Sequence, residues 1–164
     1  MNVGNSVRKA IDDWRAGESE AAMLHACNAI DGTAKKQYPT LHGNNARFTR
    51  LLRDSYSVLG RMGAPGINLE ETRFAVSVRW PKAPGGQPDI ADVLYGIHRC
   101  CRGHGEELPN GFDLFRDAAG PTHLTTMEIT KGTVRLSDRI IFGLVAVAVL
   151  SQPTEAKGSP TPTA

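Results

Sequence analysis

A polar stretch near the middle of the chain, Tyr95–Glu107 (YGIHRCCRGHGEE), holds the residue types best suited to chemistry. It places two arginines, two histidines, two cysteines and two glutamates within thirteen residues. Histidine exchanges protons near neutral pH, and arginine carries a permanent charge that binds phosphate oxygens. The stretch therefore suits a catalytic site, a metal site, or the solvated end of a helix.

Arg99 and His104 form the pair with the most coherent chemistry. A histidine serves as general acid or base, and an arginine stabilises the charge that develops on a scissile phosphate. Residues five apart on a straight α-helix diverge by about 140°, so one chain brings the pair together only if the helix bends or ends near Gly103. Two chains could instead present both groups to one shared cleft.

Three other interpretations of the stretch stay open. Its histidines and cysteines are zinc-binding types, but Cys100 and Cys101 are adjacent and the chain has no second cysteine pair. We therefore predict no metal and no cofactor. Cys100 could act as a nucleophile with His104 as its base, but no third group that would orient the base is evident. Cations at the end of a helix also stabilise its dipole without any catalytic role.

Hydrophobic periodicity predicts five helices that would position these groups. The helix carrying the polar stretch begins at Asp89, and a Pro-Gly-rich loop precedes it. The first helix ends at Gly17, and the second runs from Ser19 to Tyr38-Pro39. The third runs from a cap at Asn44 or Asn45 to Gly63. The last covers 138–151, with Ser137 and Asp138 as its cap.

Two segments predict β-structure. Phe74, Val76 and Val78 alternate with polar residues, which favours a short strand. A small hairpin is expected further on, with Lys131-Gly132 at its turn. The predicted fold is therefore mainly α, a helical bundle of about five helices with a small β-hairpin.

Composition indicates one domain over residues 1–151 and a disordered, proline-containing tail at 152–164. The net charge of +2 is too weak by itself to argue for nucleic acid. Three cysteines do not make a disulfide framework, so we expect a reducing, cytoplasmic setting. The amino-terminal segment does not resemble a signal peptide, and the apolar run 140–150 is too short to cross a bilayer, so it predicts a buried helix and no membrane association.

The Arg99-x4-His104 spacing, late on a helix in a small helical bundle, resembles the HEPN superfamily, whose members carry an R-x4-6-H motif. The segment ACNAIDGTAKKQYP in the second helix is similar to the small-residue, acidic helix of several HEPN branches. The resemblance covers most of residues 5–151. It implies a homodimer with two motifs facing one cleft, and a metal-independent endoribonuclease that uses Arg99 and His104.

Many members of that superfamily are toxins or phage-defence effectors, so the resemblance also implies RNA as substrate and a possible protein antitoxin as partner. The residue after the motif arginine is often polar in the family, whereas this chain has Cys100. This departure favours the alternative, a non-catalytic HEPN-like module that binds RNA or a protein partner.

Several residues outside the motif are candidates for RNA binding. Arg102 lies three residues after Arg99 and would assist in binding phosphate. Arg47, Arg50 and Arg53 recur every three residues on the third helix. They predict either a ridge that contacts the RNA backbone or a solvated helix face.

Two aromatic residues and one acid complete the candidates. Trp80 and Tyr95 could stack on bases or serve as packing material. Asp31, on the second helix, is expected to pair with Arg99 across helices.

Overall fold

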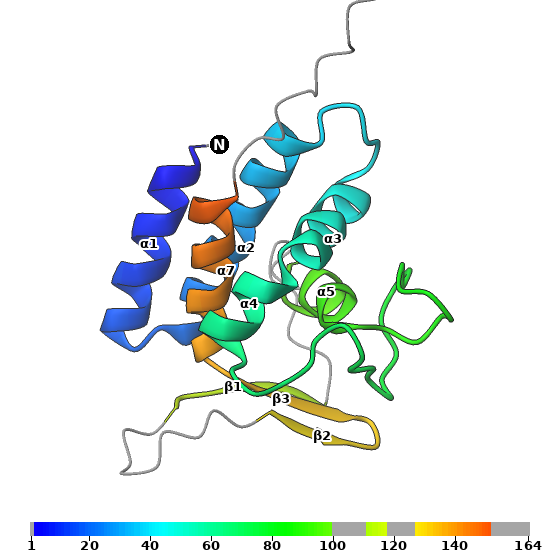
Figure 1. Ribbon diagram of the computed structural model, residues 1–164. Coiled ribbons are helices and arrows are strands. Elements are labelled where there is room, and N and C mark those ends of the chain that lie inside the picture. Colours follow the sequence, from blue (N-terminus) through cyan, green and yellow to red (C-terminus); the bar gives the residue numbers. More distant parts are fainter. Residues whose placement is uncertain (1, 100–110, 118–126, 152–164) are drawn as a thin grey trace, which may run out of the picture.

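The computed structural model describes residues 2–99, 111–117 and 127–151, except for the side chain of His98. The described residues are mainly helical, with a three-stranded sheet below the helices in the view of Figure 1. This confirms the mainly α fold with a small β element. The predicted tail at 152–164 lies outside the described residues.

The first two helices form as the sequence predicts. α1 (Val3–Ala16) ends at Gly17, which adopts the left-handed conformation (φ 87°) that glycine accepts without strain. α2 (Ser19–Gln37) follows and packs against α1, α3, α7 and η1, so it is the central helix (Figure 1). Its buried face is rich in small residues, including Ala22, Ala26 and Ala29, and these allow close approach of its neighbours.

The predicted third helix is two helices, α3 (Asn44–Asp54) and α4 (Tyr56–Gly63). The chain leaves helical geometry at Ser55 (φ −118°, ψ 18°), and Gly43 rather than Asn44 or Asn45 occupies the N-cap position. The break turns α4 onto α7, where Gly63 and Gly143 bring the two backbones together. A β-carbon built on Gly143 would lie 2.9 Å from the Cα of Gly63.

The helix that carries the polar stretch begins at Asp89, as predicted, and the Asp89 carboxylate accepts the Asp92 backbone N–H at 3.0 Å. Only its first turn is α-helical, α5 (Ile90–Val93). It continues as a π-helix, η1 (Leu94–Arg99), which the periodicity did not predict. Ile90, Val93, Leu94 and Ile97 are buried as expected.

The sheet contains the predicted hairpin and one unexpected strand. β2 (Glu128–Thr130) and β3 (Thr133–Ser137) are antiparallel around Lys131-Gly132. β1 (Phe112–Phe115) pairs in parallel with β3, which gives the order β1-β3-β2. The strand predicted at 74–78 is wrong, since those residues belong to a loop closed by a hydrogen bond from Phe74 N–H to the Pro88 carbonyl at 2.9 Å.

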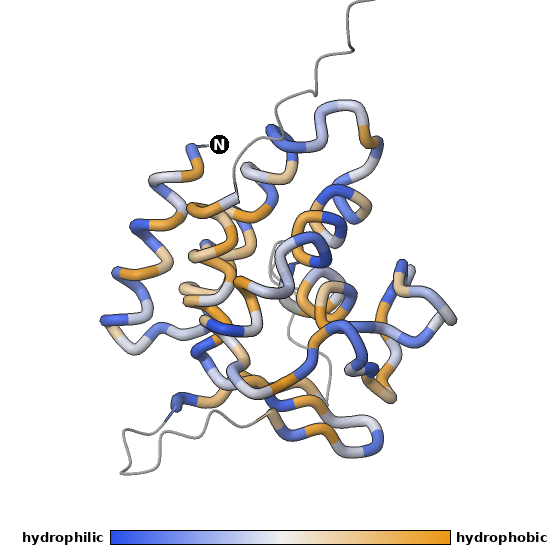
Figure 2. The backbone as a smooth tube through the Cα atoms, viewed as in Figure 1, coloured by the Kyte–Doolittle hydropathy of each residue, from blue (hydrophilic) through white to orange (hydrophobic). Residues whose placement is uncertain are grey.

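The last helix, α7 (Arg139–Leu150), begins where Ser137 accepts the Arg139 N–H at 3.2 Å. Asp138 occupies the N-cap position as expected, but its side chain makes no capping hydrogen bond; one of its carboxylate oxygens accepts the Trp14 indole N–H at 2.8 Å, which ties α1 to the start of α7. The expectation of a fully buried helix holds only in part, since Val149 and Leu150 are each 61% exposed. Figure 2 shows apolar residues recurring along the helices, and the buried core takes side chains from each of them. Within the described ranges, no helix combines the length and apolar character that a membrane span requires.

Candidate functional site

Arg99, the last residue of η1, is paired with Asp31 of α2. The Arg99 Nε–H donates to Asp31 Oδ2, and the two side chains are 24% and 16% exposed. The pairing expected across helices is thus confirmed. The remaining members of the motif region, His104, Arg102, Cys100 and Cys101, lie outside the described residues.

The two members of this ion pair respond differently to burial. Burial raises the pKa of Asp31 above its ordinary value, and the hydrogen bond and charge of Arg99 offset this only in part. Burial lowers the pKa of Arg99, but the hydrogen bond and charge of Asp31 outweigh that effect and hold the pKa above its ordinary value. The guanidinium therefore stays charged, while the carboxylate is the group of the pair that acid neutralises first.

A cavity of about 390 Å³ opens beside this ion pair. Its described lining combines the carboxyl-terminal half of α2, the amino end of α3 and the end of η1. Four of the lining side chains are cationic and one is a carboxylate. We call this cavity the Arg99 pocket; its described lining consists of Asp31, Gly32, Lys35, Lys36, Asn44, Arg47 and Arg99.

The charge of the Arg99 pocket suits an anionic ligand. Lys35 and Lys36 are exposed on α2, and the Arg47 Nε–H donates to the Leu41 carbonyl at 2.6 Å, which fixes the direction of that guanidinium. Asn44 is the first residue of α3, whose amino end adds a partial positive charge. The described lining is therefore positive on balance, and the carboxylate in it is already paired with Arg99.

Lys35 and Lys36 belong to no motif that sequence reasoning identified as a site. The signal that could have found Lys35 is its position four residues after Asp31, since residues four apart share a helix face; Lys36, five residues after Asp31, has no such signal.

The three arginines of α3, predicted to form either an RNA-contacting ridge or a solvated face, have three different environments. Only Arg47 is among the described residues that line the Arg99 pocket. Arg50 is exposed and binds Asp54 at 2.8 Å, one turn along the same helix. Arg53 is bound to two buried carboxylates, so a continuous RNA-contacting ridge is not formed.

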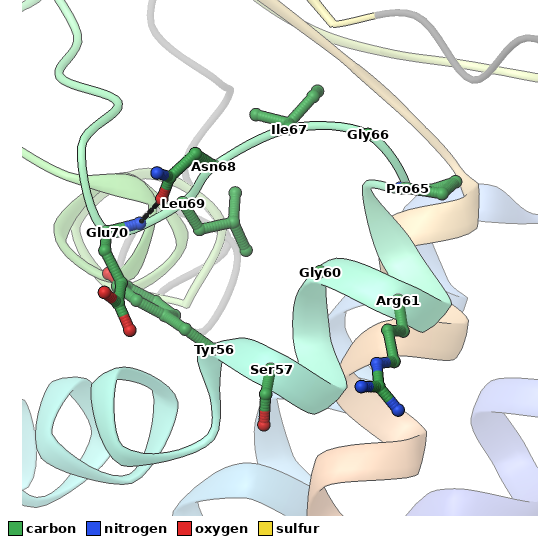
Figure 3. Close-up of a pocket in the computed structure, with 10 residues that line it drawn as sticks. All are labelled: Tyr56, Ser57, Gly60, Arg61, Pro65, Gly66, Ile67, Asn68, Leu69 and Glu70. Atoms are coloured by element: carbon green, nitrogen blue, oxygen red, sulfur yellow. Dashed lines mark hydrogen bonds between the residues drawn. The ribbon is translucent and has the colours of Figure 1, made fainter.

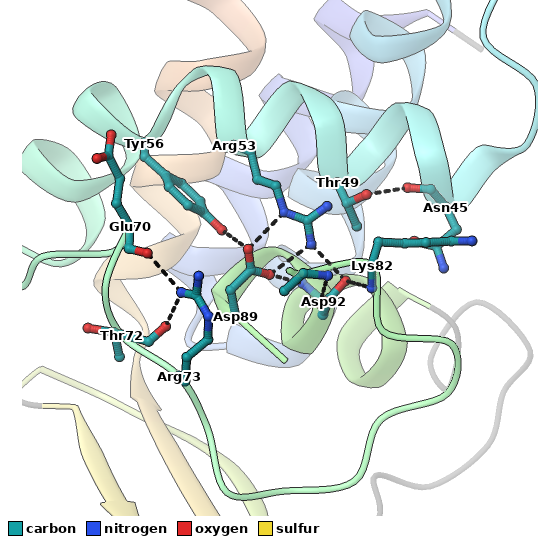
Figure 4. A network of polar contacts seen from close by, with 11 residues as sticks. Asn45, Thr49, Arg53, Tyr56, Glu70, Thr72, Arg73, Lys82, Asp89 and Asp92 are labelled. Atoms are coloured by element: carbon teal, nitrogen blue, oxygen red, sulfur yellow. Dashed lines mark hydrogen bonds and ion pairs between the residues drawn. The ribbon is translucent and has the colours of Figure 1, made fainter. Parts of the chain in front are cut away.

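Arg53 belongs to a polar network that the sequence did not reveal (Figure 4). Its guanidinium bridges Asp89 and Asp92, which are 2% and 3% exposed, while the Tyr56 hydroxyl donates to Asp89 at 2.7 Å. Burial alone would raise the pKa of Asp89, but hydrogen bonds from Arg53, the Asp92 N–H and Tyr56 hold that pKa below its ordinary value. The network thus joins α3, α4 and α5 and serves as a structural anchor.

A second hollow of about 540 Å³ lies between α4 and the loop 65–70 (Figure 3). Tyr56 lines it, but its hydroxyl is already bonded to Asp89. Burial and the Asp89 charge raise the pKa of Tyr56 well above its ordinary value, which excludes it as a base. The described lining includes Arg61 and Glu70 but no histidine or cysteine, so this hollow does not gather the acid–base types of the polar stretch.

Metal ligands do not cluster in the part of the chain that the structure describes. Within it, no three His, Cys, Asp or Glu side chains lie close enough to hold one ion. The cysteines proposed as zinc ligands lie outside those residues, and Cys27 on α2 is a buried free cysteine.

Comparison with known proteins places the chain in a family. A family model described as Rv1289 matches residues 2–163. The chain belongs to the Rv1289 family. Relatives named Uncharacterized protein Rv1289, from Mycobacterium tuberculosis, and Uncharacterized protein Mb1320, from Mycobacterium bovis, are each 43% identical over 164 residues, which is 99% of this chain and 75% of theirs. No solved protein structure matches the chain. The relatives in this family therefore extend beyond the segment that they share with this chain.

Proposed function

We propose that the protein binds RNA at the Arg99 pocket and cleaves it without a metal ion, using Arg99 and His104. The observation that carries the proposal is Arg99 itself. It is a half-buried guanidinium, oriented by Asp31, in a pocket whose other described charges are Lys35, Lys36 and Arg47. Such a cluster matches the phosphate backbone, which dominates the affinity of RNA-binding proteins.

The proposed chemistry assigns one role to each group. Arg99 binds the scissile phosphate, where its fork of N–H donors stabilises the developing charge. Lys35, Lys36 and Arg47 bind neighbouring phosphates, and Arg102 assists. Asp31 is a positioning residue, because it holds the Arg99 side chain in one direction.

His104 supplies the proton transfers. As a base it takes the proton of the 2′-hydroxyl, whose oxygen attacks phosphorus; as an acid it gives a proton to the leaving 5′-oxygen. A homodimer brings two copies of Arg99 and His104 to one cleft, so that one histidine acts as base and the other as acid. The products are a 2′,3′-cyclic phosphate and a 5′-hydroxyl end. An activity of this kind suits a cytoplasmic toxin or defence effector restrained by a protein antitoxin.

A second function is favoured by one specific observation. The carboxylate of Asp31 already occupies the Arg99 Nε–H and offsets its charge, so Arg99 has less to offer a phosphate than an unpaired arginine would. Together with Cys100 in the motif, this favours a non-catalytic module that binds RNA or a protein partner through the remaining cations.

Cleavage of a labelled single-stranded RNA in EDTA tests the proposal. We expect wild-type protein to release fragments with cyclic phosphate ends and the His104→Ala variant to bind the RNA without cleaving it. His42→Ala, in the loop between α2 and α3, is the matched control and should cleave normally. If His104→Ala cleaves as fast as wild type, the catalytic assignment is wrong. If wild type binds with a steep salt dependence and never cleaves, the binding module is correct.

A further inference from the structure

Trp80 is an exposed aromatic residue that the core does not use. It is 71% exposed, whereas Trp14 packs edge-on against Phe142 at 4.7 Å and donates its indole N–H to Asp138. Tyr95, the other aromatic candidate for base stacking, packs edge-on against Phe48 at 5.3 Å. Of the two candidates, Tyr95 is therefore packing material, and Trp80 presents its ring to solvent.

The backbone at Trp80 is strained. Its φ is +51°, and within the described residues no other residue except glycine has a positive φ. A bulky side chain rarely adopts this conformation, while glycine does so readily. Strain of this kind persists where the surrounding structure enforces it, and such positions concentrate at functional sites.

The surrounding structure does hold this residue firmly. The Trp80 carbonyl accepts a hydrogen bond from the Asn45 side chain at 3.3 Å. Directly after it, the Lys82 and Ala83 backbone N–H groups donate to the two carboxylate oxygens of Asp92, each at 2.9 Å. Because Asp92 is itself bound by Arg53, the loop that presents the indole is anchored to the buried network of Figure 4.

Two elements that contact the loop around Trp80, α3 and η1, also line the Arg99 pocket. Asn45 lies in the first turn of α3, next to Asn44 of the pocket lining. On the other side, Val78 packs against Gly96 of η1, where an added β-carbon would lie 3.2 Å from the Val78 Cβ. Gly96 precedes Arg99 by three residues. An exposed ring and a basic pocket are thus fixed to one rigid unit.

We infer that Trp80 is a stacking platform for a nucleobase of a single strand whose phosphates bind in the Arg99 pocket. The inference rests on the proposed RNA binding and adds the class of substrate, since a base in a duplex does not present an open face. Arg79 and Lys82 are exposed on either side of the Trp80-Pro81 pair and add positive charge for the backbone of that strand. Stacking on an aromatic ring tolerates any base, so the site has little sequence preference.

Fluorescence anisotropy of a 5′-fluorescein-labelled ten-residue 2′-O-methyl-uridine strand tests the inference, because this probe cannot be cleaved through a 2′-hydroxyl. We expect Trp80→Ala to weaken binding roughly 5- to 150-fold and Trp80→Phe to retain most of it. An abasic strand of the same length carries the same phosphates. We expect it to bind wild type and Trp80→Ala equally.

Two further variants keep the test decisive. Trp80→Gly removes the ring and suits the positive φ, so it should lose affinity while melting no lower than wild type. Met62→Ala removes another exposed apolar side chain, 49% exposed on α4, and should bind like wild type.

The inference is overturned if Trp80→Ala binds the uridine strand like wild type, or loses equal affinity for the abasic strand. In either case, a loss of binding in Arg99→Ala would leave the proposed RNA binding intact. If wild type binds neither strand, the proposed function and the stacking platform are both wrong.

Discussion

Replacing Arg53 with methionine removes the cation that joins two buried carboxylates. The variant keeps an unbranched side chain of similar reach but loses three hydrogen bonds. These run from Nε to Asp89 Oδ2 at 2.8 Å, and from Nη2 to Asp89 Oδ1 at 3.0 Å and to Asp92 Oδ1 at 2.9 Å. Both carboxylates remain in the interior without a counter-charge.

The expected loss of stability depends on the contacts that the two carboxylates keep. Removing one partner of a buried ion pair costs about 3–5 kcal/mol. Here Asp89 keeps the Tyr56 hydroxyl and a backbone N–H, and Asp92 keeps the backbone N–H groups of the loop. The Arg53 side chain is also 22% exposed, so water screens part of the interaction. We therefore expect a loss of about 3 kcal/mol in the free energy of unfolding at pH 7.

The loss should shrink in acid. In the wild type the pKa of Asp89 lies below its ordinary value, so its stabilising contribution is present above pH ~4 and is lost as pH falls through that lower pKa. Without Arg53 the main opposition to burial is gone, and the pKa of Asp89 rises. The variant then gains stability relative to wild type as pH falls from 7 toward 4.

Urea denaturation followed by circular dichroism at both pH values measures this difference. Arg50→Met is the matched control, because its pair with Asp54 is exposed at 62% and 42% and contributes only about 0.3–0.5 kcal/mol. If both variants lose the same small amount, or the loss at Arg53 does not change with pH, the network is not a buried, charge-dependent anchor.

Three other substitutions have defined outcomes. Asp31→Asn removes the carboxylate that offsets Arg99, so the uridine strand should bind about 3- to 10-fold more tightly at low salt, while cleavage slows because Arg99 loses its orientation. In wild type, protonation of Asp31, whose pKa burial raises, should strengthen binding as pH falls, and Asp31→Asn should abolish that dependence. Gly143→Ala places a methyl group against Gly63 and should lower stability by about 1–3 kcal/mol. Gly60→Ala, whose nearest contact would be 3.8 Å, should raise it by about 0.5–1 kcal/mol in thermal denaturation.

Sequence patterns predicted most of the helices because the residues that begin or end a helix act on their near neighbours in the chain. Gly17, Asp89 and the turn at Lys131-Gly132 act within a few residues, and the structure has each of them as expected. The break at Ser55 and the strand β1 depend on distant partners. α4 turns to reach α7, and β1 forms by pairing with β3 far along the chain. Periodicity within one segment carries no information on either contact.

The same contrast between what the sequence predicts and what depends on distant contacts applies to the candidate site. The pairing of Asp31 with Arg99 was expected, and the structure confirms it. It was predictable because Asp31 is an acid among small residues on one helix and can pair with an arginine on another. The arginines of α3 were expected to form either an RNA-contacting ridge or a solvated helix face. Arg53 does neither, because two buried carboxylates from another segment bind it, and spacing on α3 cannot reveal that contact. The exposure of Trp80 likewise depends on how its loop folds.

The wide turn of η1 matters for how related chains are compared. A π-helix closes its backbone hydrogen bonds between residues i and i+5 rather than i and i+4, so this turn holds one residue more than an α-helical turn. A related chain with an α-helical turn here would have one residue fewer and could still direct its arginine toward the counterpart of Asp31. An alignment without a gap in this turn would therefore match Arg99 to a neighbour that points elsewhere, and superposition of structures is the safer guide to its counterpart.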